Sequence, residues 1–208
     1  MGAWALGIGW VLIAVHSAVA SDRTILVLGD SLSAAYGLRA EQGWVALLQK
    51  RLQGQQYGYE VVNASVSGET TSGGLQRLPR ALAMHKPGIL ILELGANDAL
   101  RGLPLTTARG NLQKMVALAR ESKAQVLLVG MRIPPNYGPR YTSDFAQMYQ
   151  EIATQSRLPL VAFLLQSVAL DPALMQADGL HPNARGEPAV LDTLWPQLEP
   201  MLQKTAKK

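Results

Sequence analysis

The chain has 208 residues, of which 48% are hydrophobic and 16% are charged, as in an ordinary globular domain with a full hydrophobic core. The formal net charge of +4 comes from scattered basic residues that form no stripe interleaved with aromatic side chains, so it does not indicate nucleic-acid binding. The absence of cysteine excludes disulfides, thiolate zinc sites and a cysteine nucleophile, and without paired histidines we expect no metal and no cofactor.

The first twenty residues are typical of a secretory signal peptide. They contain no Asp, Glu, Lys or Arg, hold an apolar run from Trp10 to Val15 and end in the small residues Ala18-Val19-Ala20. The alternative is an uncleaved single-span anchor, for which the apolar segment is short. We therefore expect a signal peptide over 1–20 and one domain over 21–208.

Apolar runs of strand length alternate with helical patterns along the rest of the chain. The expected strands are Thr24–Leu28, Glu60–Asn63, Gly88–Leu94, Gln125–Val129 and Pro159–Ala162. The expected helices lie near Trp44–Gln53, Gly73–Met84, Thr107–Ser122, Thr142–Ser156 and Asn183–Gln203. Continuous apolar strands are expected where both faces of a sheet are covered. The pattern predicts a single-domain, three-layer α/β/α fold with a doubly wound parallel sheet of about five strands.

Four short polar clusters stand where these strands end or just before the final helix. They are GDSLS from Gly29, NASVSGETT from Asn63, GANDAL from Gly95 and DGLHPN from Asp178. Ligand sites in open α/β sheets lie outside the carboxyl ends of the strands. We therefore expect the four clusters to meet at one edge of the sheet.

Ser31, in the first cluster, is either a turn residue or a nucleophile, and a nucleophile needs a base. Of the three histidines, His16 lies in the leader and His85 in a helix-to-strand turn. His181 follows Asp178 by three residues, and the Gly-Leu between them allows a tight turn. A carboxylate on one ring nitrogen fixes the tautomer and leaves the other nitrogen free to take the serine proton. The alternative for this pair is a helix-capping turn.

Oxyanion donors are the remaining requirement for acyl chemistry at a serine. The candidates are the backbone N–H of Ser31, which opens a helix-like segment, the backbone N–H of Gly68, and the side-chain amide of Asn97. Taken singly, Gly68 can be a turn residue and Asn97 a helix cap. Together with the histidine and its acid they indicate serine acyl transfer, while Asp30 is expected to hold the turn. An α/β-hydrolase is disfavoured, because its nucleophile motif Gly-x-Ser-x-Gly lies in mid-chain.

The four clusters resemble, in order, the blocks of the GDSL (SGNH) hydrolase family. The segments ILVLGDSLSAAYGL, NASVSGETTSGGLQRLPRAL and LELGANDALRGLP are most similar to the exported multifunctional acyl-CoA thioesterase I/protease I/lysophospholipase group of Gram-negative bacteria. The resemblance implies a flavodoxin-like sheet, Ser31 as nucleophile, and Asp178 and His181 as orienting acid and base. It also implies an oxyanion hole formed by Ser31, Gly68 and Asn97.

The expected activity is that of a periplasmic serine esterase and thioesterase acting on fatty-acyl esters. The resemblance implies a mobile substrate loop over Ala99–Pro104. Leu100, Leu103 and Pro104 of this loop, with Ile133 of the proline-rich loop farther along, are the expected apolar wall of an acyl pocket.

The expected substrate is a small-molecule acyl ester or thioester. Ester lipids of the envelope, membrane-derived lipids among them, are favoured because the acyl-CoA pool is cytoplasmic. We expect a monomer. One alternative is a carbohydrate O-acetylesterase that uses the same catalytic set, and another is a non-catalytic binding protein that has kept the fold.

Overall fold

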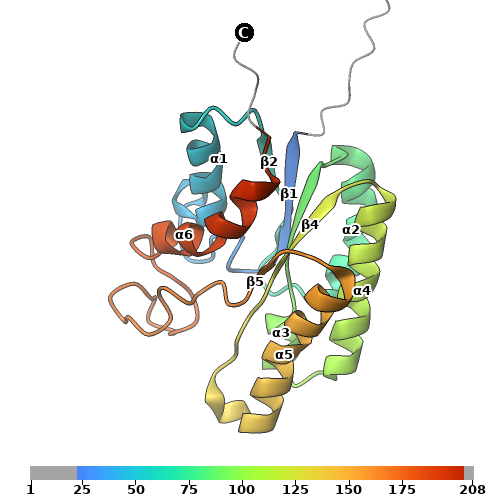
Figure 1. Ribbon diagram of the computed structural model, residues 1–208. Helices are drawn as coiled ribbons and strands as arrows, with labels where there is room; N and C mark the ends of the chain where they lie inside the picture. Colours follow the sequence, from blue (N-terminus) through green and yellow to red (C-terminus); the bar gives the residue numbers. More distant parts are fainter. Residues whose placement is uncertain (1–22, 204–208) are drawn as a thin grey trace, which may run out of the picture.

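Five parallel strands form the centre of the computed structural model, which describes residues 23–203 (Figure 1). They are β1 (Thr24–Gly29), β2 (Glu60–Asn63), β3 (Ile89–Glu93), β4 (Gln125–Val129) and β5 (Leu160–Val161). In space they run in the order β2-β1-β3-β4-β5. This is the flavodoxin-like order, and the five predicted strands are confirmed to within one residue at either end. The predicted signal peptide, 1–20, lies outside the described residues.

Helices cover both faces of the sheet, which confirms the three-layer fold (Figure 1). Helices α1 (Trp44–Gly54) and α6 (Glu187–Leu198) pack together on one face. The other face carries α2 (Thr71–His85), α4 (Leu105–Glu121) and α5 (Pro139–Ser156), and the short α3 (Ala96–Leu100) follows β3. Single 3₁₀ turns are η1 (Ala40–Gln42), η2 (Pro135–Tyr137) and η3 (Glu199–Met201). Across residues 23–203, none of the helices has the length and apolar character needed to span a bilayer.

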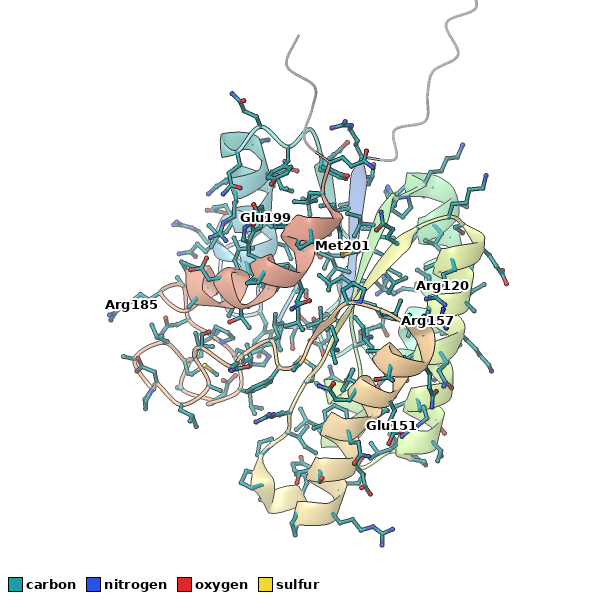
Figure 2. The ribbon with its side chains drawn as sticks, in the orientation of Figure 1. Arg120, Glu151, Arg157, Arg185, Glu199 and Met201 are labelled. Atoms are coloured by element: carbon teal, nitrogen blue, oxygen red, sulfur yellow. The ribbon has the colours of Figure 1, made fainter. Side chains whose placement is uncertain are left out.

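The final helix is shorter than the predicted Asn183–Gln203. Asn183 turns the chain before α6, because its Oδ1 accepts hydrogen bonds from the N–H groups of Arg185 (2.9 Å) and Gly186 (3.3 Å). After α6 the backbone tightens into η3 (Glu199–Met201), whose first and last residues are labelled in Figure 2. The prediction ran past the C-terminal end of the helix because Met201 and Leu202 also pack against the core.

The two central strands, β1 and β3, are buried along their whole length. Their continuous apolar sequences follow from this, because helices cover both of their faces. Glu93, the last residue of β3, is the one charged side chain in these two strands, and it is fully buried. The carboxyl ends of β1 and β3 are therefore a rigid base for the loops that follow them.

Glu187, the first residue of α6, joins the two helices of one face. Its Oε2 accepts the backbone N–H of Trp44, the first residue of α1, at 2.7 Å. Burial raises the pKa of Glu187 to about 7, and the hydrogen bond from Trp44 opposes part of this rise. Because the folded-state pKa lies above that of an unfolded glutamate, protonated Glu187 favours the folded state.

We expect Glu187→Gln to be more stable than the wild type at about pH 8, with the difference shrinking toward about pH 5. The stability that the wild type derives from protonating Glu187 is complete below the unfolded pKa of about 4.3 and is lost as pH rises through about 7. The neutral glutamine still accepts the Trp44 N–H and does not titrate. Calorimetric melting temperatures of both proteins across this range measure the effect. The same difference in melting temperature at both ends would contradict it.

Candidate active site

Ser31 lies in a tight turn directly after β1, at the carboxyl edge of the sheet. The N–H of Ala34 donates to the carbonyl of Asp30 at 2.9 Å, and the N–H of Tyr36 donates to the carbonyl of Ser31 at 3.1 Å. Ala35 has φ +57°, so the backbone leaves the helical conformation after one turn. The predicted helix-like segment at Ser31 is therefore limited to one turn and does not continue as a helix. It is a run of turns, and no extended helix dipole acts on the serine.

The imidazole of His181 connects Ser31 to Asp178. Its Nε2 lies 2.8 Å from Ser31 Oγ, and its Nδ1 lies 2.7 Å from Asp178 Oδ2. The other oxygen of Asp178 accepts the N–H groups of Leu180 (2.9 Å) and His181 (3.1 Å). Gly179, which lies between Asp178 and Leu180, has φ +66°, a conformation that favours glycine. The three-residue spacing thus closes a tight turn that returns the carboxylate to the ring.

The hydrogen bonds to Asp178 keep its carboxyl ionised. Burial raises the pKa of Asp178, but the Leu180 N–H, the His181 ring and the His181 N–H together outweigh burial and hold that pKa below its usual range. A carboxylate only accepts hydrogen bonds, so the proton sits on Nδ1 of His181 and Nε2 is left to accept from the Ser31 hydroxyl. The Tyr36 ring covers the imidazole, with 4.7 Å between the ring centroids.

Gly68 and Asn97 are placed by the loops that follow β2 and β3. Gly68 has φ +78°, and its carbonyl accepts a hydrogen bond from the Arg101 guanidinium at 2.8 Å. Asn97 is the second residue of α3, and its Nδ2 donates to Asp30 Oδ2 at 3.0 Å. Over residues 23–203, the backbone N–H groups of Ser31 and Gly68 have no protein acceptor. Both N–H groups are therefore available to a ligand.

An apolar cavity of about 200 Å³ opens beside Ser31. Its polar wall is formed by Asp30, Ser31, Asn97, Arg132 and His181. Its apolar wall includes Leu32, Leu100, Met131, Ile133, Leu165 and Leu180. The cavity thus places an apolar surface next to the serine, the amide and the imidazole. Gly68 is not part of its lining and lies on the neighbouring loop.

Two of the four residues expected in the acyl pocket line this cavity. Leu100 and Ile133 line the cavity, whereas Leu103 and Pro104 do not. Leu103 is 39% exposed, and Pro104 precedes the first turn of α4 as its cap. The Tyr141 hydroxyl donates to the carbonyl of Leu103 at 3.0 Å, which ties this end of the predicted substrate loop to α5. The mobility of that loop stays a prediction.

Comparison with known proteins agrees with this fold and identifies the family. The model of the GDSL-like lipase/acylhydrolase family matches residues 27–188. The chain belongs to this family. It is therefore a hydrolase of the GDSL type, and the predicted family, fold and enzyme class are confirmed.

Named members of the GDSL family resemble the chain over most of its length. Esterase TesA of Pseudomonas aeruginosa is 48% identical, over 93% of this chain and 96% of that protein. Thioesterase 1/protease 1/lysophospholipase L1 of Escherichia coli is 39% identical, over 96% of this chain and 94% of that protein. The crystal structure of the psychrotrophic esterase EstA from Pseudoalteromonas sp. superposes with a TM-score of 0.82 at 41% identity, covering 86% and 97% of the two chains.

Sequence reasoning missed several residues of this GDSL site. Met131 and Leu165 line the cavity, but nothing in their local sequence separates them from ordinary loop residues. Met131 follows Gly130, where a Cβ would lie 2.6 Å from the Ala162 carbonyl oxygen. The close packing of the segments that follow β4 and β5 brings Met131 to the site. This packing cannot be read from the sequence.

Proposed function

We propose that this GDSL hydrolase is a serine esterase and thioesterase that cleaves fatty-acyl esters with Ser31, His181 and Asp178. The observation that carries the proposal is the hydrogen-bonded series from Ser31 Oγ to His181 Nε2 (2.8 Å) and from His181 Nδ1 to Asp178 Oδ2 (2.7 Å). A serine hydroxyl becomes an active nucleophile when a base lies within hydrogen-bond reach of it and an orienting acid lies within reach of the base. The series ends at the mouth of an apolar cavity, as an acyl ester requires.

In the acylation step, Nε2 of His181 takes the Ser31 proton while Oγ attacks the carbonyl carbon of the ester. The electron pair of the C=O double bond moves onto the carbonyl oxygen. The N–H groups of Ser31 and Gly68 and the Asn97 amide bind the resulting oxyanion. Each such donor is worth about 3–4 kcal/mol of barrier. Asp178 stabilises the imidazolium, which then gives its proton to the departing alcohol or thiol. Ser31 is left acylated.

Deacylation repeats the same proton transfers with water as the nucleophile. His181 takes a proton from water as the water oxygen attacks the acyl carbonyl, and the same donors bind the second oxyanion. Collapse of this intermediate returns the proton to Ser31 Oγ and releases the fatty acid. Besides the substrate and this water, the steps use only side chains and backbone N–H groups of the chain.

The apolar lining of the cavity favours an acyl chain over a sugar as the group nearest the serine. Leu100 and Ile133 line it, together with other aliphatic side chains from three further loops. The relatives of this chain include an esterase and a thioesterase/lysophospholipase, which supports a range of leaving groups. We propose that ester lipids of the envelope, lysophospholipids among them, are the native substrates, and that the protein acts as a monomer.

We expect p-nitrophenyl esters of medium and long fatty acids to be hydrolysed with a higher kcat/KM than the acetate ester. Each methylene buried in the cavity contributes about 0.8 kcal/mol. Steady-state kinetics on a series from acetate to palmitate measure the preference, with Ser31→Ala as the blank at each length. Hydrolysis of the acetate ester alone would contradict the fatty-acyl proposal and favour a carbohydrate O-acetylesterase.

Export to the periplasm of a Gram-negative bacterium is proposed from the sequence of residues 1–20, which has the apolar core and small-residue end of a signal peptide. Export would place the enzyme beside envelope lipids and away from cytoplasmic acyl-CoA. Cell fractionation followed by N-terminal sequencing tests it. A cytoplasmic protein that still begins at Met1 would contradict it.

A further inference from the structure

A buried pair of carboxyl groups lies beneath the turn that carries Ser31. Asp30, which precedes the serine, is 1% exposed, and Glu93 at the end of β3 is fully buried. Gly29 and Glu93 are paired in the register of β1 and β3. A Cβ at Gly29 would lie 2.5 Å from Glu93 Oε2, so glycine at this position leaves the room that the second carboxyl occupies. Acidic side chains this deeply buried are rare unless they have partners.

The two carboxyl oxygens of Asp30 have different partners. Oδ1 accepts the N–H of Leu32 at 3.1 Å, which holds the turn as the sequence predicted. Oδ2 accepts a hydrogen bond from Nδ2 of Asn97 at 3.0 Å. An amide NH₂ group has two protons, and Asp30 takes one of them. The second is left for an acceptor in the cavity that Asn97 lines.

Glu93 supports Asp30 from the side of the sheet. Its Oε2 accepts the Ser33 hydroxyl at 2.7 Å and the Asp30 N–H at 3.2 Å, and its Oε1 has no partner among residues 23–203. Burial and then the neighbouring Asp30 charge raise the pKa of Glu93 well above its usual range. Burial raises the pKa of Asp30 to about 6, against the Leu32 N–H and the electrostatic interaction with His181. Because the two carboxyls disfavour each other's charge and the pKa of Glu93 is raised the more strongly, we assign the shared proton to Glu93 and the negative charge to Asp30.

The other ionisable groups around the pair come from three elements. Tyr149 of α5 donates its hydroxyl to a backbone carbonyl after β3, and Asp98 of α3 accepts both the N–H and the hydroxyl of Thr71. His181 faces Asp30 from the loop before α6, and the positive charge that its ring gains during the reaction would favour ionised Asp30. Of the side chains that line the cavity, Asn97 donates a hydrogen bond to the Asp30 carboxylate, at 3.0 Å.

We propose that Asp30 is a positioning residue, whose buried carboxylate, backed by Glu93, holds the Asn97 amide with its nitrogen toward the reacting centre. This inference rests on the proposed role of Asn97 as an oxyanion donor. A carboxylate accepts hydrogen bonds and cannot donate them, so it selects the amide nitrogen and excludes the flipped side chain, in which a carbonyl oxygen would face the oxyanion. The link also fixes the donor before substrate arrives, as preorganisation requires.

A double-mutant cycle with Asp30→Asn and Asn97→Ala tests whether Asp30 acts through the amide. Removing the donor in Asn97→Ala is expected to lower kcat by about 10²- to 10³-fold. Asp30→Asn is expected to lower kcat at least about tenfold, with KM changed by no more than about twofold, because the donor is lost mainly in the transition state. Adding Asp30→Asn to Asn97→Ala is expected to change kcat by less than about threefold.

Two results of this cycle would overturn the inference. If the two losses multiply in the double variant, Asp30 acts by another route than the amide. Wild-type kcat in folded Asp30→Asn, with kcat reduced in Asn97→Ala, overturns the inference and leaves the proposed function standing. Wild-type kcat in Asn97→Ala would overturn the oxyanion role of Asn97 and the inference together.

Glu93→Gln tests the neutral state of the second carboxyl. Glutamine has the shape of a protonated glutamate and accepts the same hydrogen bonds, so kcat is expected to stay within about threefold of wild type. Glu187→Gln is the matched control, because Glu187 is also a buried carboxyl that accepts a backbone N–H but lies between α1 and α6. A loss of kcat in folded Glu93→Gln as large as in Asp30→Asn would overturn the assignment of the charge to Asp30.

A measurement on the unmutated enzyme covers the case in which Asp30→Asn does not fold. In protein labelled with ¹⁵N-asparagine, the side-chain amide signal of Asn97 is identified by its absence from Asn97→Ala. Its shift is expected to titrate with a midpoint near the Asp30 pKa of about 6. An amide signal unchanged between about pH 5 and pH 8 would overturn the link.

Discussion

Ser31→Ala is expected to lower kcat by about 10⁴- to 10⁶-fold on every ester that the wild type hydrolyses. The substitution removes the attacking oxygen, and only binding and the oxyanion donors remain to assist the attack of water. Its effect on stability is expected to be small, because the side chain loses the hydrogen bond to His181 and leaves no large cavity. Steady-state kinetics, with circular dichroism to check the fold, measure both effects.

Ser167→Ala is the matched control for this experiment. Ser167 is an exposed serine whose hydroxyl bonds to Thr193, outside the cavity lining. It is expected to keep wild-type kcat. Full esterase activity in folded Ser31→Ala would mean that another residue attacks the ester.

His181→Ala is expected to lower kcat about as much as Ser31→Ala, and the double variant no further, because nucleophile and base act as one unit. Among residues 23–203, Nε2 of His181 is the hydrogen-bond acceptor for the Ser31 hydroxyl, at 2.8 Å, and the variant lacks it. The pH dependence of kcat/KM should change as well, since the residual rate no longer depends on a histidine. Kinetics of the single and double variants test this.

His85→Ala controls for the loss of an imidazole, since His85 ends α2 and does not line the cavity. Its kcat is expected to equal that of the wild type. If the losses in Ser31→Ala and His181→Ala multiplied in the double variant, the two residues would be acting independently, contrary to the proposed mechanism.

Much of the fold could be predicted because the sheet is buried on both faces. Apolar runs such as that of β3 have few other stable placements, and the glycine and polar residues after them mark the strand ends. The pairing of Asp178 with His181 was also predictable, because a three-residue turn is local and its glycine permits φ +66°. Local geometry of this kind is specified by a few neighbouring residues.

The remainder of the site depends on contacts between distant segments. From the sequence, Asp30 was expected to hold its own turn, and its Oδ1 does accept a hydrogen bond there. Its Oδ2 accepts a hydrogen bond from Asn97, because β1 and β3 are neighbours in the sheet. Leu103 was expected in the pocket from its apolar character. It is outside because Tyr141 binds its carbonyl, and a tyrosine far along the chain gives no sequence signal for that contact.

Covalent labelling of Ser31 tests the central claim most directly. The enzyme is treated with diethyl p-nitrophenyl phosphate, which leaves a stable phosphoryl group on an activated serine, and the adduct is located by peptide mass spectrometry. We expect one adduct per chain, on Ser31, formed in step with the loss of activity and greatly slowed in His181→Ala. Loss of activity with Ser31 unmodified, or an adduct on a different residue, would contradict it.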